Sequence, residues 1–184
     1  MTRKELREHV FRILFTCEFY RPDEDDIREQ IDLYFTHEPE EEMDYPPAQV
    51  DEEQIPEIKE RAADIASRIG ELDDRIDEVS AGWKTSRMSR CDLTILRLAA
   101  YEMLFDDHVP TGVAISEAVL LAKKFGGDSS SSFVNGILAK LNRSREEAGA
   151  GAKAEPADGE SMQTADSKAA AEAAVNPAEG RTDG

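Results

Sequence analysis

Apolar residues recur every three or four positions along most of the first 143 residues, which is the spacing of helices with a buried face. No segment shows the alternation expected of a strand, so the sequence predicts an all-α fold. The clearest helix spans 3–20. Thr2 and Glu5 form a capping box at its start, in which each side chain satisfies the other's free backbone N–H. Its apolar positions make two rows: Leu6, Val10, Ile13, Leu14 and Cys17, and beside them Phe11, Phe15 and Phe19.

Proline, glycine and helix-capping residues divide the rest of the helical pattern. Four prolines among many acids predict an exposed loop over 37–56. Gly70 is expected to break the helix before it, and Ala81-Gly82-Trp83 to link two helical lobes. Ser89 and Asp92 predict a second capping arrangement. The expected helices after the first are 25–35, 57–69, 72–79, one beginning at Ser89, one between Thr111 and Gly126, and one from about Ser132 to Arg143.

Two glycine positions carry specific predictions. Gly126-Gly127 is expected to end a helix in the left-handed turn that glycine readily adopts. Asn135-Gly136 is a hairpin signal, but Phe133, Ile137 and Leu141 keep a four-residue step through it, which favours a helix. Glycine inside a helix costs about 1 kcal/mol relative to alanine, so we expect Gly136 to contact a neighbouring helix closely.

The formal charge of −18 at first argues against a nucleic-acid partner. The acids are unevenly placed, however: residues 21–60 hold 16 acidic and 3 basic residues, whereas residues 1–20 hold 3 and 4. Residues 146–184 are rich in alanine and contain no aromatic residue, which predicts a disordered tail. Net charge therefore does not exclude a local basic surface on the remainder.

Arg3, Lys4 and Arg7 lie in the first turns of the first helix, where the helix dipole disfavours cations. A local rule broken without structural gain is expected at functional sites. One interpretation is an anion site that meets a phosphate backbone; the other is ordinary solvated charge near a chain terminus.

Lys123 and Lys124, next to Phe125 and followed by the hydroxyl-rich loop 126–132, are a second candidate site. Lysines beside an aromatic ring can hold phosphates while the ring stacks on a base. In the alternative, Phe125 belongs to the core and the lysines only favour a helix C-terminus.

Enzymatic and metal-dependent classes find little support in the residue pattern. His9, His37 and His108 are scattered, and no phosphate-binding glycine loop or His-Glu-x-x-His motif is present. Cys17 and Cys91 lack metal-ligand spacing and are expected to pack as apolar side chains. No apolar run is long enough for a membrane helix. We expect a cytoplasmic, non-enzymatic protein without a metal, a cofactor or a small-molecule substrate.

Five segments together resemble the C-terminal signature of the NusB family of transcription antitermination factors, in order and at its spacing. They are 95–103, 109–110, 113–118, 121–126 and 133–138. The N-terminal Arg3-Lys4-x-x-Arg7-Glu8 and Leu14-Phe15-x-x-Glu18 resemble that family's arginine-rich first helix. The resemblance implies a seven-helix fold over 1–145, with lobes 1–82 and 83–145, before the tail 146–184.

The resemblance also implies a function. Members of the family bind the boxA element of nascent ribosomal RNA leader transcripts together with NusE, a ribosomal small-subunit protein, and join other Nus factors on RNA polymerase. By similarity, the RNA-binding residues are Arg3, Lys4, Arg7, Lys123, Lys124, Ser129, Ser132 and Phe133. The residues expected near NusE are Phe15, Glu18 and Asp92.

Several positions depart from the family pattern. Phe15 stands where tyrosine is usual, Ser116 replaces an asparagine, and the loop 128–132 lacks a basic residue or histidine, which weakens the expected RNA contact. The acidic insert 38–53 and the tail have no counterpart in compact members. Two other functions stay open: a helical protein-interaction scaffold without RNA binding, and a module related to the N-terminal domain of ribosomal RNA cytosine methyltransferases.

Overall fold

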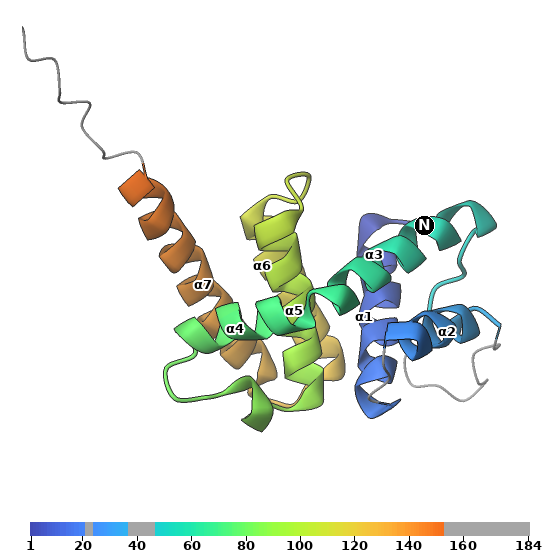
Figure 1. Cartoon of the computed structure of the whole chain (residues 1–184), viewed down its shortest axis with the longest axis horizontal. Coiled ribbons are helices and arrows are strands. Elements are labelled where there is room, and N and C mark those ends of the chain that lie inside the picture. Colours follow the sequence, from blue (N-terminus) through green and yellow to red (C-terminus); the bar gives the residue numbers. More distant parts are fainter. Residues whose placement is uncertain (21–23, 37–46, 153–184) are drawn as a thin grey trace, which may run out of the picture. The chain divides into compact units, whose positions relative to one another are not determined.

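The computed structural model describes residues 1–20, 24–36 and 47–152. Over these residues the chain is all-α and contains no strand, as the periodicity predicts (Figure 1). The helices are α1 Arg3–Tyr20, α2 Glu24–Tyr34, α3 Ile55–Ser67, α4 Ile69–Val79, α5 Arg90–Phe105, α6 Thr111–Phe125 and α7 Ser130–Ala152, with short 3-10 turns η1 Glu52–Gln54 and η2 Thr85–Arg87. The expected seven-helix fold is confirmed.

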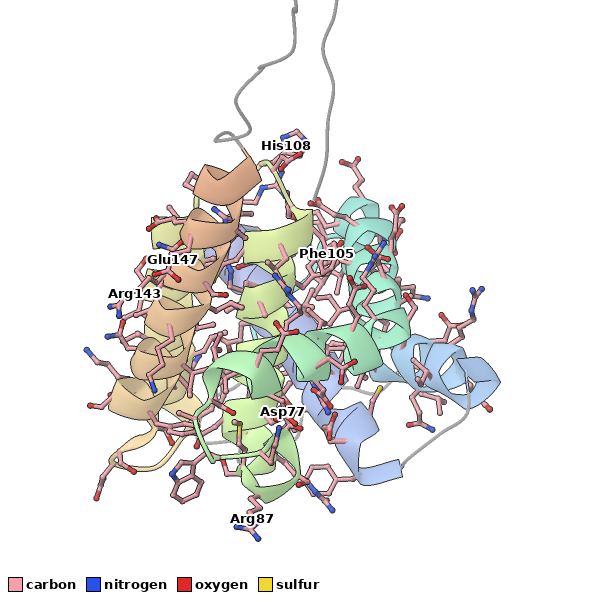
Figure 2. All side chains as sticks on the ribbon, turned by 60° about the vertical axis from the view of Figure 1, so that its left-hand side comes forward. Asp77, Arg87, Phe105, His108, Arg143 and Glu147 are labelled. Carbon is pink, nitrogen blue, oxygen red and sulfur yellow. The ribbon has the colours of Figure 1, made fainter. Side chains whose placement is uncertain are left out.

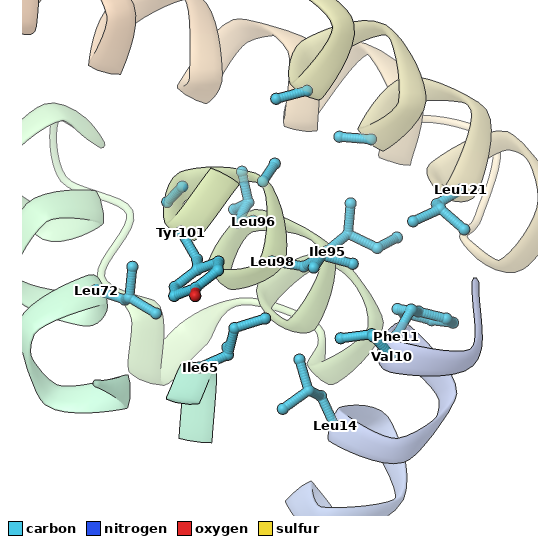
Figure 3. Close-up of a cluster of buried hydrophobic side chains, with 14 of the residues drawn as sticks. Val10, Phe11, Leu14, Ile65, Leu72, Ile95, Leu96, Leu98, Tyr101 and Leu121 are labelled. Atoms are coloured by element: carbon cyan, nitrogen blue, oxygen red, sulfur yellow. The ribbon is translucent and has the colours of Figure 1, made fainter. Parts of the chain in front are cut away.

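Helix α5 lies at the centre of this arrangement, between α1–α3 on one side and α6 and α7 on the other (Figure 1). Its residues 93–103 are all buried, which explains the broad apolar pattern of this segment. Helix α1 packs on α2, α3 and α5. Figure 3 shows Val10 and Leu14 of α1 and Ile65 of α3 facing Ile95 and Leu98 of α5. Burial of these aliphatic side chains provides the main stabilisation.

The predicted boundaries hold at several helix starts. Thr2 N–H donates to Glu5 Oε2 at 2.6 Å and Glu5 N–H donates to Thr2 Oγ1 at 3.2 Å, so the capping box forms. Ser89 Oγ accepts from Asp92 N–H at 3.1 Å and caps α5. Helix α3 begins at Ile55, two residues earlier than expected, because Pro56 occupies the first turn, where its missing N–H costs nothing.

Three expectations about glycine are wrong. The break between α3 and α4 falls at Arg68 (φ −107°, ψ 8°), and Gly70 lies within α4. Gly126 ends α6 in an extended conformation (φ −90°, ψ 179°) instead of a left-handed one. Gly136 is exposed, and a Cβ added there would meet nothing within 4 Å, so no neighbouring helix requires this glycine.

The lobe boundary at residue 82 stays a prediction. Helix α4, which precedes that boundary, packs against α5 and α7 and has fewer contacts with α3. Helix α7 continues to Ala152, beyond the expected end near Arg143. The disordered tail was predicted to begin at residue 146, but residues 146–152 belong to α7. The rest of the tail, and residues 38–46 of the acidic insert, lie outside the described residues.

His9 connects α1 to α2 inside the protein. Its side chain is buried and its Nδ1 lies 2.8 Å from the Tyr34 hydroxyl. Burial lowers the pKa of His9 below 6.5, although the backbone of Ala48 and the carboxylate of Glu8 oppose this shift. The folded protein therefore favours the neutral imidazole.

We expect the free energy of unfolding to fall as the pH decreases below about 6.5. The unfolded chain then binds a proton on His9 that the folded chain excludes, and this difference favours unfolding. Urea denaturation at pH 7.5 and 5.5 measures the effect. His9→Gln should flatten this pH dependence, whereas the control His108→Gln, at an exposed position, should leave it unchanged. An equal slope in wild type and His9→Gln would contradict the assignment.

Candidate nucleic-acid interface

The start of α1 presents two of the three predicted cations to solvent. The Arg3 side chain is 76 % exposed and forms an ion pair with Glu57 of α3. Lys4 is exposed and has no ion-pair partner among the described residues. An exposed ion pair contributes little stability, so Arg3 can exchange Glu57 for a phosphate oxygen at small cost.

Arg7 lies inside the protein instead. Its Nε is 2.9 Å from both carboxylate oxygens of Glu102 on α5, and its Nη1 is 3.6 Å from Glu117 of α6. Only 8 % of its side chain is exposed. The guanidinium joins three helices. Arg7 therefore has a structural role that the sequence pattern did not show. Its burial sets Arg7 apart from the exposed Arg3 and Lys4.

The end of α6 is held against α1 by a second group of contacts. Lys124 Nζ donates to the two carboxylate oxygens of Glu8 at 2.7 and 2.9 Å, and Arg12 bonds Glu8 at 2.8 Å. Burial alone would raise the pKa of Glu8, but these two cations lower it below its ordinary value. The Phe125 ring packs on Phe11 with centroids 4.9 Å apart. Phe125 is thus half-buried, and its neighbour Lys123 is exposed.

The α6–α7 turn presents the predicted hydroxyl groups. Ser130 is buried, and its Oγ accepts from Gly127 N–H at 2.9 Å, which fixes the start of α7. Ser129 and Ser132, on either side of it, are exposed, and Phe133 is half-buried. Of the four serines 129–132, Ser130 thus has a structural hydroxyl, Ser131 is half-buried, and Ser129 and Ser132 are exposed.

The two candidate sites, far apart in the sequence, meet through the Glu8–Lys124 ion pair. Glu8 lies one helical turn after Lys4, and Lys124 directly follows Lys123, so the pair joins the helix start that carries Lys4 to the helix end that carries Lys123. Arg12, which the sequence analysis missed, stands at this junction, with its guanidinium 4.9 Å from the Phe125 ring centroid. Its four-residue spacing from Glu8 was the available signal. We call Arg3, Lys4, Lys123, Ser129 and Ser132 the cationic surface.

The three residues expected near NusE lie around the other end of α1. Phe15 is half-buried between Phe11 and Phe19, with ring centroids 5.8 and 5.1 Å away. Glu18 forms an ion pair with Arg97 of α5. The Asp92 Oδ1 is buried, and no described residue bonds it.

A pocket of about 270 Å³ opens beside Glu18, and its lining combines apolar side chains with Arg90 and Arg97. Phe19, at the end of α1, is 56 % exposed. The Cζ atom of the Arg90 guanidinium lies 4.7 Å from the centroid of its ring. Aromatic rings and arginine are enriched at protein-binding surfaces.

The fold is all-helical, and its exposed cations lie at a helix start and before a hydroxyl-rich turn. These features indicate the class of helical proteins that contact nucleic-acid phosphates. None of the described helices is long and apolar enough to cross a membrane. Within the described ranges, no group of three or more His, Cys, Asp or Glu side chains is placed to hold a metal ion.

The chain belongs to the NusB family, whose model matches residues 4–143. It is 48% identical over 141 residues to the transcription antitermination protein NusB of Lachnoclostridium phytofermentans, covering 77% of this chain and 98% of that protein. The NusB of Agathobacter rectalis is 46% identical over 144 residues, with 77% and 99% covered.

Solved structures share the fold. NusB of T. maritima superimposes with a TM-score of 0.64 at 30% identity, covering 78% of this chain and 92% of that one. A structure of antitermination factors NusB and NusE in complex with dsRNA gives a TM-score of 0.60 at 19% identity, covering 77% and 96%. The predicted family membership is confirmed.

Proposed function

We propose that this protein is a transcription antitermination factor that binds boxA-type RNA together with NusE and joins the Nus complex on RNA polymerase in the cytoplasm. This chain matches nearly the whole length of two relatives that are transcription antitermination proteins. The observation that carries the RNA-binding part is the Glu8–Lys124 ion pair, because it joins the start of α1, which carries Lys4, to the end of α6, which carries Lys123.

The cationic surface explains how a chain of charge −18 holds RNA. Many of its acids lie in 21–60 and 146–184, away in sequence from α1 and the end of α6. Phosphate contacts depend on local charge and release counterions from the nucleic acid. Arg3, Lys4 and Lys123 would contact phosphates, and Ser129 and Ser132 would donate hydrogen bonds to the RNA backbone.

NusE is the proposed protein partner. A structure that shares this fold contains NusB, NusE and dsRNA. The exposed Phe19 and the half-buried Phe15 lie in the C-terminal half of α1, and the half-buried Asp92 lies in the first turn of α5, where Arg90 packs on the Phe19 ring. Binding of NusE there would leave Arg3 and Lys4, in the first turn of α1, free for RNA, and a polar group of NusE would satisfy the Asp92 Oδ1 that no described residue bonds.

The decisive experiment measures affinity for fluorescently labelled boxA RNA with and without NusE, against a scrambled RNA of equal length. We expect tighter binding to boxA, a further gain with NusE, and weakening as salt is raised. Equal affinity for both RNAs at moderate salt would refute the proposal. The proposed role is non-catalytic, and methyl transfer from S-adenosylmethionine by the purified chain would contradict that part.

Lys4→Ala and Lys123→Ala should each weaken RNA binding across sequences. Each should also reduce the slope of log affinity against log salt by about 0.7, the value for one phosphate contact on a single strand. Fluorescence anisotropy at four salt concentrations measures both quantities. Arg75→Ala, a partly exposed cation on α4, is the matched control and should leave the slope unchanged. An unaltered slope in both lysine variants would remove these residues from the surface.

A further inference from the structure

Trp83 is the only tryptophan of the chain, and 59 % of its surface is exposed. It lies in the segment between α4 and α5, which leaves a large apolar ring in water where burial would stabilise the protein. Neither the core nor the cationic surface includes it. The exposure of Trp83 therefore does not help to stabilise the fold.

Hydrogen bonds fix the backbone of the segment that carries this ring. The buried Ser80 and Thr85 flank the exposed residues 81–84, and Thr85 N–H donates to Asp77 Oδ1 at 2.7 Å. Between them Trp83 N–H donates to Ser80 C=O at 3.2 Å and closes a turn. Ala81 has φ +42°, a left-handed conformation that a residue with a side chain adopts at some cost and that is often found at functional positions.

Trp83 makes an edge contact with Phe133, with centroids 6.3 Å apart and planes at 69°. Phe133 lies in the first turn of α7, directly after the exposed Ser132. The aromatic pair is thereby connected to the cationic surface through the α6–α7 turn. This edge contact uses only part of the ring, and more than half of the Trp83 surface stays exposed.

Two cations accompany the ring. The Lys84 side chain is 61 % exposed and lies 3.5 Å from Asp77. Arg87 is exposed and has no ion-pair partner among the described residues. Figure 2 shows Arg87 extending from the ribbon at the end of the molecule away from His108. An aromatic ring flanked by cations and hydroxyls is the arrangement on which proteins hold unpaired bases.

We propose that Trp83, supported by Phe133, stacks on an unpaired base of the bound RNA, while Lys84 and Arg87 contact the adjoining phosphates. This inference rests on the proposed function and extends its site across the start of α7 to the α4–α5 segment. A protein helix would require several apolar contacts at helical spacing, whereas this segment offers a single exposed ring. An RNA base matches that surface better.

The test combines anisotropy of labelled single-stranded boxA RNA, measured with NusE present, and tryptophan emission. RNA should quench the emission of Trp83, with the Trp83→Phe complex measured in parallel to subtract any NusE signal. Trp83→Ala should weaken RNA binding about 5- to 150-fold, the range for loss of one stacked base. Trp83→Phe should retain most of the affinity, since a smaller ring still stacks. Leu120→Ala, also exposed, is the control.

The outcomes separate the two proposals. If wild type binds RNA but Trp83→Ala binds equally well without quenching in wild type, the stacking inference is wrong and the proposed function stands. If wild type does not bind RNA with or without NusE, the proposed function itself fails. If Trp83→Ala loses NusE and keeps its RNA affinity, Trp83 belongs to a protein interface and the inference is overturned. Thermal unfolding of each variant shows that the fold is intact.

Discussion

Glu102→Ala is expected to destabilise the protein by about 3–5 kcal/mol, the cost of leaving a buried charge without its partner. The Glu102 side chain is 2 % exposed and accepts two hydrogen bonds from Arg7 at 2.9 Å. Arg61 approaches it at 3.4 Å. Burial raises the pKa of Glu102, and the two guanidinium groups oppose that rise. Removal of the carboxylate would strand the buried Arg7 between α1, α5 and α6.

Urea denaturation measures this effect. The matched control is Glu57→Ala, which removes the exposed partner of Arg3. An exposed ion pair contributes about 0–1 kcal/mol, so the control should change stability little. A loss below about 1 kcal/mol in Glu102→Ala would show that the buried pair is not needed for the packing of the three helices. RNA affinity of the folded fraction should be unaffected, since neither oxygen of Glu102 faces solvent.

Gly126→Ala is expected to destabilise the protein by about 1–3 kcal/mol or more, as overpacking does. A Cβ at this position would lie 2.4 Å from Ser130 Cβ and 2.6 Å from the Ala122 carbonyl oxygen. Both neighbours belong to helix ends, so relief requires movement of the α6–α7 turn. Because that turn presents Ser129 and Ser132, RNA binding should weaken as well.

Gly136→Ala is the matched control, because the same change is made at an exposed position in α7 where nothing lies within 4 Å. Alanine favours a helix over glycine by about 1 kcal/mol, so this variant should be more stable than wild type. Thermal and urea unfolding compare the two. Equal effects of the two substitutions would show that the close approach at Gly126 does not restrict the turn.

The glycines show what local sequence pattern cannot predict. The signal at Gly126-Gly127 correctly predicts the end of α6 but not its conformation, because Gly126 is required by the approach of Ser130 and not by a positive φ. The expectation for Gly136 was wrong because a four-residue apolar step shows which face is buried. It does not show how closely a neighbouring backbone approaches the opposite face.

Arg7 and Arg12 show the same limit for charge. Three cations in the first turns of α1 indicate an anion site, and Arg3 and Lys4 are indeed exposed there. Arg7 falls instead on the inner face, where its partner Glu102 is distant in the sequence. Arg12 was missed because its role follows from Lys124 and Phe125, which reach it only in the folded chain.

The sequence by itself determined the all-α class, the extent of α1, the caps of α1 and α5, and membership in the NusB family. Apolar spacing and capping depend on residues a few positions apart, and so local chemistry suffices for them. Only the tertiary structure decided which cations remain exposed, that Glu8 and Lys124 unite two candidate sites, and that Trp83 stands in solvent beside Phe133. These depend on distances between helices, which hydrophobic periodicity does not encode.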